Sequence, residues 1–252
     1  MATRPAVIVT GGGSGIGQAS VRRLLDQGWQ VVAADRDPEA LERTAASCAD
    51  DGDRLSTALL DVTNEAMIDE LVERTLRERG PVAGLVNSAG VGADATFLDT
   101  TAQMLRSVYE INLIGSFLVA KAVAKAMAQS GGGSIVNIGS VSGIAGNVGR
   151  AAYGASKAAI TTLTKVMAVE LAPLGIRVNI VAPGPIETPL VAAFHSKRMR
   201  QSWYRTVPMR RYGMPEEVAG AIAYLIDPDG SSYVTGQVIG VDGGFLAGGI
   251  ID

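Results

Sequence analysis

The stretch Thr10-Gly-Gly-Gly-Ser-Gly-Ile-Gly17 decides the fold. It follows an apolar run, Ala6-Val-Ile-Val9, that is typical of a buried strand, and it opens a helix-like segment that ends at Gly28. Glycine is needed where a chain turns tightly, where its backbone approaches a phosphate, and where a helix packs closely on a strand. The first turn of a helix also offers free N–H groups and a partial positive charge. This order of strand, turn and helix indicates a nucleotide-phosphate site rather than a plain glycine-rich turn.

Outward from this turn, short apolar runs alternate with longer helix-like segments. Strands are expected at 6–9, 30–34, 55–60, 84–87, 134–138, 176–181 and 237–241, and helices at 15–27, 38–47, 64–78, 102–128, 151–171 and 215–226. The strand runs are continuously apolar, which is typical of a parallel sheet covered on both faces. Right-handed crossovers then give a doubly wound α/β sheet that binds ligands at the carboxyl ends of its strands. No linker divides the chain, so a single domain over 1–252 is expected, with a substrate-loop insertion at about 184–206.

Composition excludes several classes of protein. The 22 basic and 25 acidic side chains, net charge of -3 and 47% hydrophobic content describe an ordinary globular chain. The single Cys48 excludes a disulfide-stapled scaffold, and the single His195 excludes a metal site built from several histidines. An aromatic content of 5% without a basic stripe argues against nucleic-acid binding. Because no signal peptide is present and the apolar runs are broken before about 18 residues, a cytoplasmic protein with no membrane span is expected.

Asp35, at the end of the second expected strand, predicts which dinucleotide is bound. A carboxylate there accepts hydrogen bonds from both hydroxyls of an adenosine ribose and repels a 2′-phosphate. At about 4 Å and an effective dielectric of about 20, this repulsion is about 4 kcal/mol per unit charge before screening. NAD is therefore expected over NADP. Arg36 follows directly and could turn toward a phosphate, and a merely solvated strand-end carboxylate is the alternative for Asp35.

Two further strand ends are candidate cofactor contacts. Asp61 and the backbone of Val62 could hold the adenine, and the turn Asn87-Ser-Ala-Gly90 has small residues that let a cofactor lie close to the sheet. Each of these, taken alone, would indicate only a turn.

The helix expected from Ala151 carries Tyr153-Gly-Ala-Ser-Lys157, whose tyrosine and lysine share one face. Ser140 ends the fifth expected strand and therefore lies at the same rim of the sheet as the glycine turn. A useful general base titrates near ~7, whereas free tyrosine titrates near ~10. The ammonium of Lys157 and a positive nicotinamide ring would lower the pKa of Tyr153. Tyr153 would then exchange a proton with an alcohol or carbonyl oxygen that Ser140 hydrogen-bonds.

These motifs, in this order and together with Pro183-Gly184, resemble the classical short-chain dehydrogenase/reductase family over nearly the whole chain. The resemblance implies a single Rossmann-type domain with a seven-stranded sheet, usually assembled into tetramers. It implies that Asn112 is a fourth catalytic residue, holding a water that links Lys157 to solvent; a buried asparagine that caps backbone groups is the alternative. It also implies that Lys157 binds the nicotinamide ribose and that Ile186 and Thr188 contact the carboxamide. Ser88 stands where the family more often has a second asparagine.

The expected site can be stated residue by residue. The expected catalytic residues are Asn112, Ser140, Tyr153 and Lys157. The expected cofactor-binding residues are Gly11, Ser14, Gly15, Ile16, Gly17, Asp35, Asp61, Val62, Asn87, Ala89, Gly90, Tyr153, Lys157, Pro183, Gly184, Ile186 and Thr188, and no metal is expected.

The substrate pocket is expected between the residues after Gly90, the stretch 142–150 and the 184–206 loop. Ser142, Arg150 and His195 are its candidate substrate contacts. Arg150 lies one helical turn before the tyrosine and could anchor a carboxylate or sulfonate through its fork of N–H groups; a surface arginine near a helix N-terminus is the alternative. The basic run 195–211 fits an anionic substrate, a coenzyme A phosphate or a solvated amphipathic lid helix.

Together these features predict an NAD-dependent, homotetrameric oxidoreductase for a small secondary alcohol or ketone. An NADP-dependent 3-oxoacyl reductase is the alternative of the same class, and Asp35 and Ser14 argue against it. A non-catalytic dinucleotide-binding regulator is the alternative of another class, and the complete set of catalytic residues argues against that. An epimerase or dehydratase usually needs a larger substrate domain than this chain provides.

Overall fold

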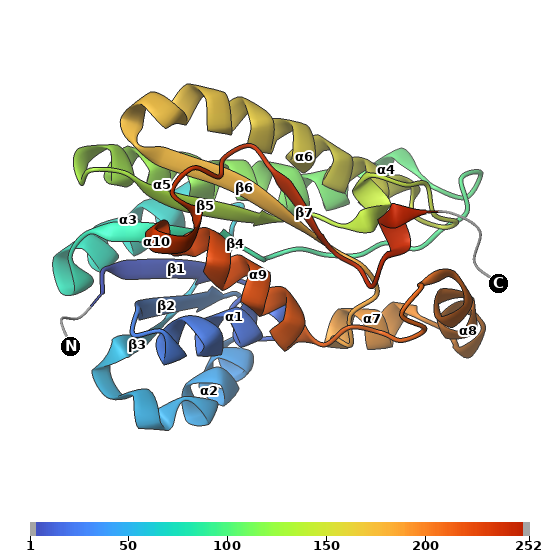
Figure 1. Cartoon of the computed structure of the whole chain (residues 1–252), viewed down its shortest axis with the longest axis horizontal. Coiled ribbons are helices and arrows are strands. Elements are labelled where there is room, and N and C mark those ends of the chain that lie inside the picture. The colour runs from blue at the N-terminus through green and yellow to red at the C-terminus, as the bar shows by residue number, and fades with distance from the viewer. Residues whose placement is uncertain (1–3, 249–252) are drawn as a thin grey trace.

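The computed structural model describes residues 4–248, and its centre is one sheet of seven parallel strands. The strand order is β3-β2-β1-β4-β5-β6-β7, so the chain winds from β1 to one edge and then from β4 to the other (Figure 1). The winding reverses between β1 and β4, which is where ligands bind in sheets of this kind. The predicted doubly wound, seven-stranded sheet is confirmed. The strands are β1 Ala6–Thr10, β2 Gln30–Asp35, β3 Leu55–Leu59, β4 Val82–Asn87, β5 Gly133–Ile138, β6 Ile176–Pro183 and β7 Val238–Val241.

Helices cover both faces of the sheet because successive strand residues point to opposite sides. In β1, whose five residues are all buried, Ile8 packs with the layer that contains α3, α5 and α6. Val7 and Val9 pack with the layer that contains α1 and α9. The helices are α1 Gly15–Asp26, α2 Pro38–Ser47, α3 Glu65–Arg79, α4 Ala102–Tyr109, α5 Ser116–Gln129, α6 Ala151–Leu171, α7 Pro189–Phe194, α8 Lys197–Thr206, α9 Pro215–Ile226 and α10 Pro228–Ser231.

The sequence predicts one regular helix over 102–128, and the structure departs from this in the middle. A π-helical turn, η2 (Glu110–Gly115), separates α4 from α5. A Cβ atom on Gly115 would lie 2.6 Å from Cγ2 of Val62, so this glycine lets the turn press against the end of β3. Turns with i→i+5 hydrogen bonds occur often at functional sites, and Asn112 lies within this one.

The same helical run is long and apolar enough to cross a membrane, with a mean hydropathy of 1.5 over its best window. Its apolar runs are nevertheless broken by Glu110, Gly115 and Lys121, as expected, and only the window average meets this length and composition test. Half of that window is buried inside the protein, and Val119, Val123 and Met127 of α5 are fully buried in the core. This burial is what a core helix of the sheet layer requires.

The segment after β6 was expected to be an irregular loop and instead contains two short helices. Thr188 caps α7 by accepting a hydrogen bond from the N–H of Val191, and Ser196 caps α8 by accepting one from Met199. Neither helix contains a residue in the buried class, so the apolar periodicity that reveals core helices is absent from both. Figure 1 places them beyond the carboxyl ends of the strands.

A chain of polar side chains crosses the core beneath this edge of the sheet. The Nδ2 group of Asn87 donates to the side-chain oxygen of Asn137 (3.0 Å) and to the backbone oxygen of Ser116 (3.1 Å). Asn137 in turn donates to Oγ1 of Thr164 on α6 (2.9 Å). These bonds tie β4, β5, α5 and α6 together where the site is built.

We expect the Thr164→Val variant to be less stable by about 1–3 kcal/mol, because it keeps the shape of the side chain but leaves the buried N–H of Asn137 without its acceptor. Urea unfolding followed by circular dichroism measures this loss. Thr162→Val on the exposed side of the same helix is the matched control. Equal stability of the two variants would mean that the hydrogen bond between Asn137 and Thr164 does not stabilise the fold.

Candidate active site

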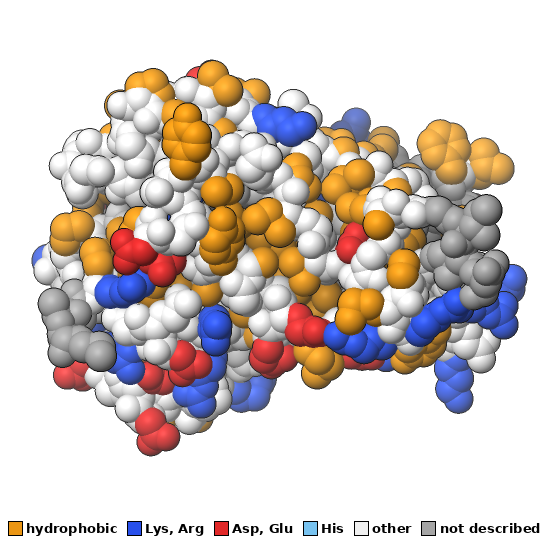
Figure 2. Space-filling model, viewed as in Figure 1, with side chains coloured by type: hydrophobic (Ala, Val, Ile, Leu, Met, Phe, Trp, Pro, Cys, Tyr) orange, Lys and Arg blue, Asp and Glu red, His pale blue; other side chains and the backbone are white. Residues whose placement is uncertain are grey.

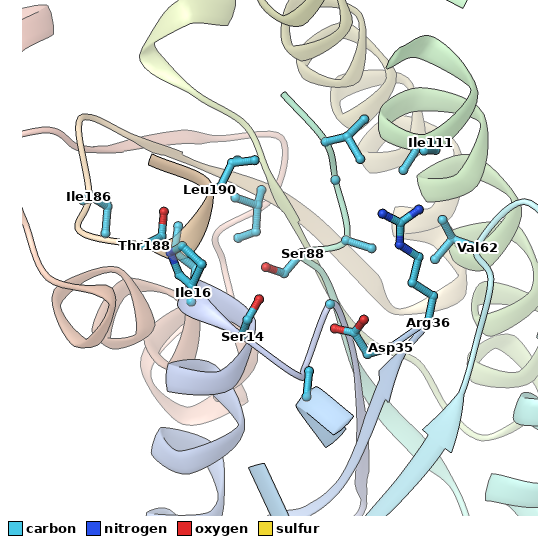
Figure 3. Close-up of a pocket in the computed structure, with 18 of the residues that line it drawn as sticks. Ser14, Ile16, Asp35, Arg36, Val62, Ser88, Ile111, Ile186, Thr188 and Leu190 are labelled. Atoms are coloured by element: carbon cyan, nitrogen blue, oxygen red, sulfur yellow. The ribbon is translucent and has the colours of Figure 1, made fainter. Parts of the chain in front are cut away.

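A cavity of about 470 Å³ lies at the carboxyl ends of the strands, against the N-terminus of α1. One end is lined by Asp35, Arg36 and Asp61, and the other by Ser140 and Tyr153. Figure 3 shows Ser14 and Ile16 from the glycine turn on one side of this space and Ser88 on another, with Thr188 drawn beside Ile16. An elongated cavity with a carboxylate at one end and a phenol at the other has the form that a dinucleotide requires.

The glycine turn is shaped to receive phosphate groups. Gly11 has a φ of 67°, and a Cβ there would lie 2.8 Å from the backbone nitrogen of Ala89. A Cβ on Gly17 would overlap the carbonyl oxygen of Gly11, so only glycine allows α1 to begin this close to β1. The Ser14 side chain does not cap α1, which leaves the amides of the first turn available to an anion.

Thr10 has a role that the sequence reasoning missed. Its hydroxyl oxygen accepts hydrogen bonds from the backbone N–H groups of Ser88 and Ala89, each at 3.2 Å. This buried side chain therefore fixes the turn after β4 against the glycine turn after β1. Its position as the last residue of a buried strand, next to the glycines, was the available signal.

Asp35 is held in a fixed orientation by the backbone. Its Oδ2 accepts from the N–H of Gly13 (3.0 Å) and its Oδ1 from the N–H of Asp37 (3.1 Å). Arg36 also lines the cavity, and in Figure 3 its guanidinium extends toward Ile111 and Val62, away from the Asp35 carboxylate. The two side chains thus present opposite charges to different parts of the same end of the cavity.

The other expected nucleotide contacts divide into two groups. Asp61 lines the cavity, but its Oδ1 also accepts from the backbone N–H and hydroxyl of Thr63, and these bonds lower the pKa of the carboxyl. Asn87, expected beside the cofactor, points into the core instead, where it bonds Asn137 and Ser116. Gly17 likewise acts through packing and does not line the cavity.

Ser140 and Tyr153 meet at the deep end of the cavity. Their side chains are hydrogen-bonded to one another, and the Ser140 hydroxyl also accepts from the N–H of Ser142 (3.1 Å). Burial raises the pKa of Tyr153, while the Ser140 hydrogen bond and the positive charge of Arg150 act in the opposite direction. The protein's own groups therefore favour the neutral phenol, which differs from the sequence-based expectation that Lys157 would lower this pKa.

Lys157 lies near the tyrosine but is anchored elsewhere. Its Nζ donates to the backbone oxygen of Ile138 (2.7 Å) and stands 5.8 Å from the centre of the Tyr153 ring. Burial without a carboxylate partner lowers the pKa of this lysine to about 8. The side chain reaches the cavity wall, where its remaining N–H groups can meet a hydroxylated ligand.

Asn112 holds the loop after β4 in place by hydrogen bonds to its backbone. Its Oδ1 accepts from the N–H of Val91 (2.8 Å), and its Nδ2 donates to the Val91 oxygen (3.0 Å) and to Oγ of Ser156 (3.1 Å). A Cβ on Gly90 would lie 3.1 Å from the Asn112 Oδ1 and 3.7 Å from the Lys157 Nζ. The asparagine thus caps backbone groups, as its alternative interpretation predicted, while lying close to the lysine.

The expected substrate contacts gather in a smaller cavity of about 60 Å³ that shares Ser140 and Tyr153 with the first. Ser142, Arg150 and His195 all line it. Arg150 is not a surface residue, since only 12% of its side chain is exposed. Apolar residues of α7 and α8 form much of its wall, namely Leu190, Val191, Phe194 and Trp203.

Most expected site residues line the large cavity, and several further ones do so that sequence reasoning did not single out. Those further residues are Ala34, Asp37, Ala40, Arg43, Leu60, Val91, Ile111, Ile138, Gly139, Pro189, Leu190 and Val191. Half of them directly follow or precede an expected residue in the chain, which was the available signal for that half. Within residues 4–248, no group of three or more histidine, cysteine or acidic side chains is placed to hold a metal ion.

Comparison with known proteins places this chain among enzymes of one family. The family model described as enoyl-(acyl carrier protein) reductase matches residues 11–246. The 3-oxoacyl-[acyl-carrier-protein] reductase FabG of Thermotoga maritima is 41% identical over 95% of this chain and 96% of its own. The cis-4-hydroxycyclohexanecarboxylate dehydrogenase of Sinomonas cyclohexanicum is 40% identical over 95% and 96%. The crystal structure of an actinorhodin polyketide ketoreductase with NADPH superposes with a TM-score of 0.91 at 37% identity, covering 97% of this chain and 99% of that one.

The buried lysine makes stability depend on pH in a defined direction. Since folding lowers the pKa of Lys157 from 10.5 to about 8, the unfolded chain binds more protons between these values, and stability rises with pH across that window. We expect the free energy of unfolding of the wild type, relative to Lys157→Met, to increase by up to about 3 kcal/mol from pH 7.5 to about pH 10.

Urea unfolding at a series of pH values measures this difference. Lys165→Met, which removes an exposed lysine from the same helix, should show no comparable change relative to the wild type. If the difference in free energy of unfolding between the wild type and Lys157→Met does not change with pH, the lysine is not desolvated in the folded protein.

Proposed function

Because the chain belongs to the classical short-chain dehydrogenase/reductase family, we propose that it is an NAD-dependent enzyme that interconverts a secondary alcohol and a ketone. The family's enzymes are oxidoreductases that act on alcohol and keto groups with a nicotinamide dinucleotide. The observation that carries the proposal is that Ser140, Tyr153 and Lys157 meet at one end of a cavity that the glycine turn and Asp35 line at the other.

The roles of the polar groups follow from their positions. Bound nicotinamide dinucleotide supplies the acceptor or donor of hydride. Ser140 would hydrogen-bond the substrate oxygen and stabilise the charge that develops on it. Tyr153 would give its phenolic proton to that oxygen during reduction and take a proton from the alcohol during oxidation.

The direction of the pKa shift bears on this proton transfer. Burial keeps the Tyr153 phenol neutral, which suits proton donation to a ketone. Alcohol oxidation needs the phenolate, and the positive charges of Arg150, Lys157 and an oxidised nicotinamide would all favour it. We infer that Lys157 positions the nicotinamide ribose, and that Asn112 links the lysine to solvent by holding water near Gly90.

Asp35 supports NAD as the cofactor. Its carboxylate is fixed by two backbone N–H groups at the position where a ribose hydroxyl is expected, and a 2′-phosphate there would meet like charge. Asp61 and the Val62 backbone would hold the adenine, while Ile186 and Thr188 would contact the carboxamide across the cavity.

An NADP-dependent 3-oxoacyl reductase is the second candidate. The names of relatives such as the Thermotoga maritima enzyme favour it, as does the NADPH bound to the ketoreductase. Arg36, which lines the cavity beside Asp35, could compensate part of the charge of a 2′-phosphate. The carboxylate of Asp35 and the uncharged Ser14 argue against this candidate, so cofactor preference separates the two.

The whole chain is proposed to act as one catalytic domain, with 184–206 as a lid over the substrate, within a cytoplasmic homotetramer. Figure 2 shows hydrophobic side chains gathered over α9 and β7 on the face in view. Tyr224, Met214 and Met209 are substantially exposed there, and β7 is an edge strand with one open side. An apolar face along an open edge strand is suited to pairing with a second copy.

We expect Tyr153→Phe to lower kcat by about 100- to 10,000-fold, because it removes the proton that is exchanged with substrate. NAD affinity should change little, since the ring itself is kept. Turnover is measured by absorbance of the reduced nicotinamide across a panel of secondary alcohols and hydroxy acids, and affinity by titration calorimetry. Tyr233→Phe, at a fully exposed tyrosine, is the control. Unchanged turnover of Tyr153→Phe would contradict the proposed function.

Asp35→Asn tests the cofactor. The wild type should bind NAD more tightly than NADP, and the variant should narrow the ratio of the two dissociation constants by about tenfold or more, because the repelling charge is removed. Asp53→Asn, at an exposed carboxylate on the turn before β3, should leave the ratio unchanged. Tighter binding of NADP by the wild type would favour the 3-oxoacyl reductase candidate.

A further inference from the structure

Arg150 is a cation built into the wall of the substrate cavity. It directly precedes α6, and its Cζ lies 5.5 Å from the centre of the Tyr153 ring. Only 12% of its side chain is exposed, and it lines the small cavity beside Ser140 and Tyr153. Burying a guanidinium next to a reacting group has a free-energy cost, so its partners decide what it can still bind.

His195 fixes the position of the guanidinium. Its Nε2 lies 2.9 Å from Nη2 of Arg150, and its Nδ1 lies 2.9 Å from the hydroxyl of Tyr212. Arginine can only donate, so Nε2 is the acceptor and Nδ1 carries the proton. Burial lowers the pKa of His195 to about 4, which keeps the ring neutral at neutral pH. The histidine therefore orients Arg150 without neutralising its charge.

The nearby carboxylates leave part of the arginine's binding capacity unused. Asp94 forms an ion pair with Arg150 through one oxygen that lies 3.6 Å from Nε, which is longer than a hydrogen bond, so it compensates part of the guanidinium charge without engaging Nη1. Glu187 forms an ion pair with Arg200, whose guanidinium stacks on Tyr212, so its charge is already matched. Within residues 4–248, the contacts of Arg150 engage Nε and Nη2 and leave Nη1 for a further acceptor.

The rest of the small cavity is apolar. Phe194 and Leu190 line it, and Trp203 stacks on His195 with ring centres 6.2 Å apart and planes at 6°. One charged corner, the three hydroxyl groups of Ser140, Ser142 and Tyr153, and an apolar wall would accept a hydrocarbon skeleton that carries an anion at one position and a hydroxyl at another.

We propose that Arg150 is the anion-binding group of the substrate site, and that the substrate is a hydroxy acid or the matching oxo acid. Its carboxylate binds the guanidinium that His195 positions, while its hydroxyl or keto oxygen meets Ser140 and Tyr153. This inference rests on the proposed function and adds the substrate class to it. In the oxidative direction the hydroxy acid would give a hydride to bound oxidised NAD and its hydroxyl proton to the Tyr153 phenolate, and its carboxylate would stay unchanged.

The test compares each of a series of hydroxy acids with its carboxamide, which has nearly the same shape but no charge. For the wild type, kcat/KM should be at least about tenfold higher for the best acid than for its amide. Arg150→Met should reduce this acid-to-amide ratio by about 10- to 100-fold, and Arg150→Lys by less. Arg198→Met, at an exposed arginine of α8, should leave the ratio unchanged.

The same comparison separates binding from an effect on the tyrosine. The charge of Arg150 also acts on Tyr153, and if that were its whole role, Arg150→Met would slow acid and amide equally. An equal loss, or an unchanged ratio, overturns the proposal. His195→Gln keeps the arginine but removes the imidazole that accepts from it, so the acid-to-amide ratio of kcat/KM should fall toward that of Arg150→Met.

A binding measurement gives a readout that does not depend on turnover. The chain has two tryptophans, so in Trp29→Phe the fluorescence reports only Trp203 in the small cavity. With NAD present, cyclohexanecarboxylate should change this signal at a concentration about tenfold lower than cyclohexanecarboxamide, and Arg150→Met should abolish the difference.

Equal binding of the two probes by the wild type overturns the inference. Its failure is distinct from failure of the proposed function. If Tyr153→Phe loses turnover but Arg150→Met keeps the acid-to-amide ratio, the enzyme is an oxidoreductase without an anion site. If Tyr153→Phe keeps turnover, the proposed function itself fails.

Discussion

The close approach of α1 to β1, which only a glycine at position 17 permits, is the constraint on which the site depends. Without a Cβ there, the first turn of α1 lies against the carbonyl of Gly11, and its unpaired amides face the cavity. The Thr10 hydroxyl then holds the turn after β4 at the same edge. Because β4 adjoins β5 in the sheet, this places Ser140 and the start of α6 within reach of a molecule bound at the glycine turn.

The reacting end of the cavity combines groups whose burial is costly. A lysine with a pKa of about 8, a phenol held neutral and a guanidinium that is only 12% exposed lie around one point. Each is held by a hydrogen bond to a neighbouring group of the protein. The backbone oxygen of Ile138 accepts from Lys157, Ser140 bonds Tyr153, and Nε2 of His195 accepts from Arg150. Fixed polar groups in a region of low dielectric interact strongly with charge that develops during a reaction.

The two ends of the cavity differ in the groups that line them. At the end where we propose that the nucleotide binds, a rigid carboxylate and a neighbouring arginine line the cavity with opposite charges. At the other end, residues next to and within α6 and residues of α7 and α8 set the shape and the charge of the smaller cavity. Relatives that share this fold at about 40% identity bear the names of different substrates, as expected when specificity lies in segments grafted on a common sheet.

The sequence alone determined the parallel sheet, its order of elements and the residues at the strand ends, because these depend on local glycine chemistry and on the period of apolar residues. It did not reveal the π-helical turn at Asn112 or the short helix α7, and it gave α8 only as one alternative for the basic run 195–211, because neither helix carries a buried apolar stripe. Only the tertiary structure turned Asn87 into the core and joined Arg150 to His195, which is 45 residues away in the chain. Whether a polar side chain faces a ligand or another side chain is decided by such long-range contacts, and no local pattern encodes them.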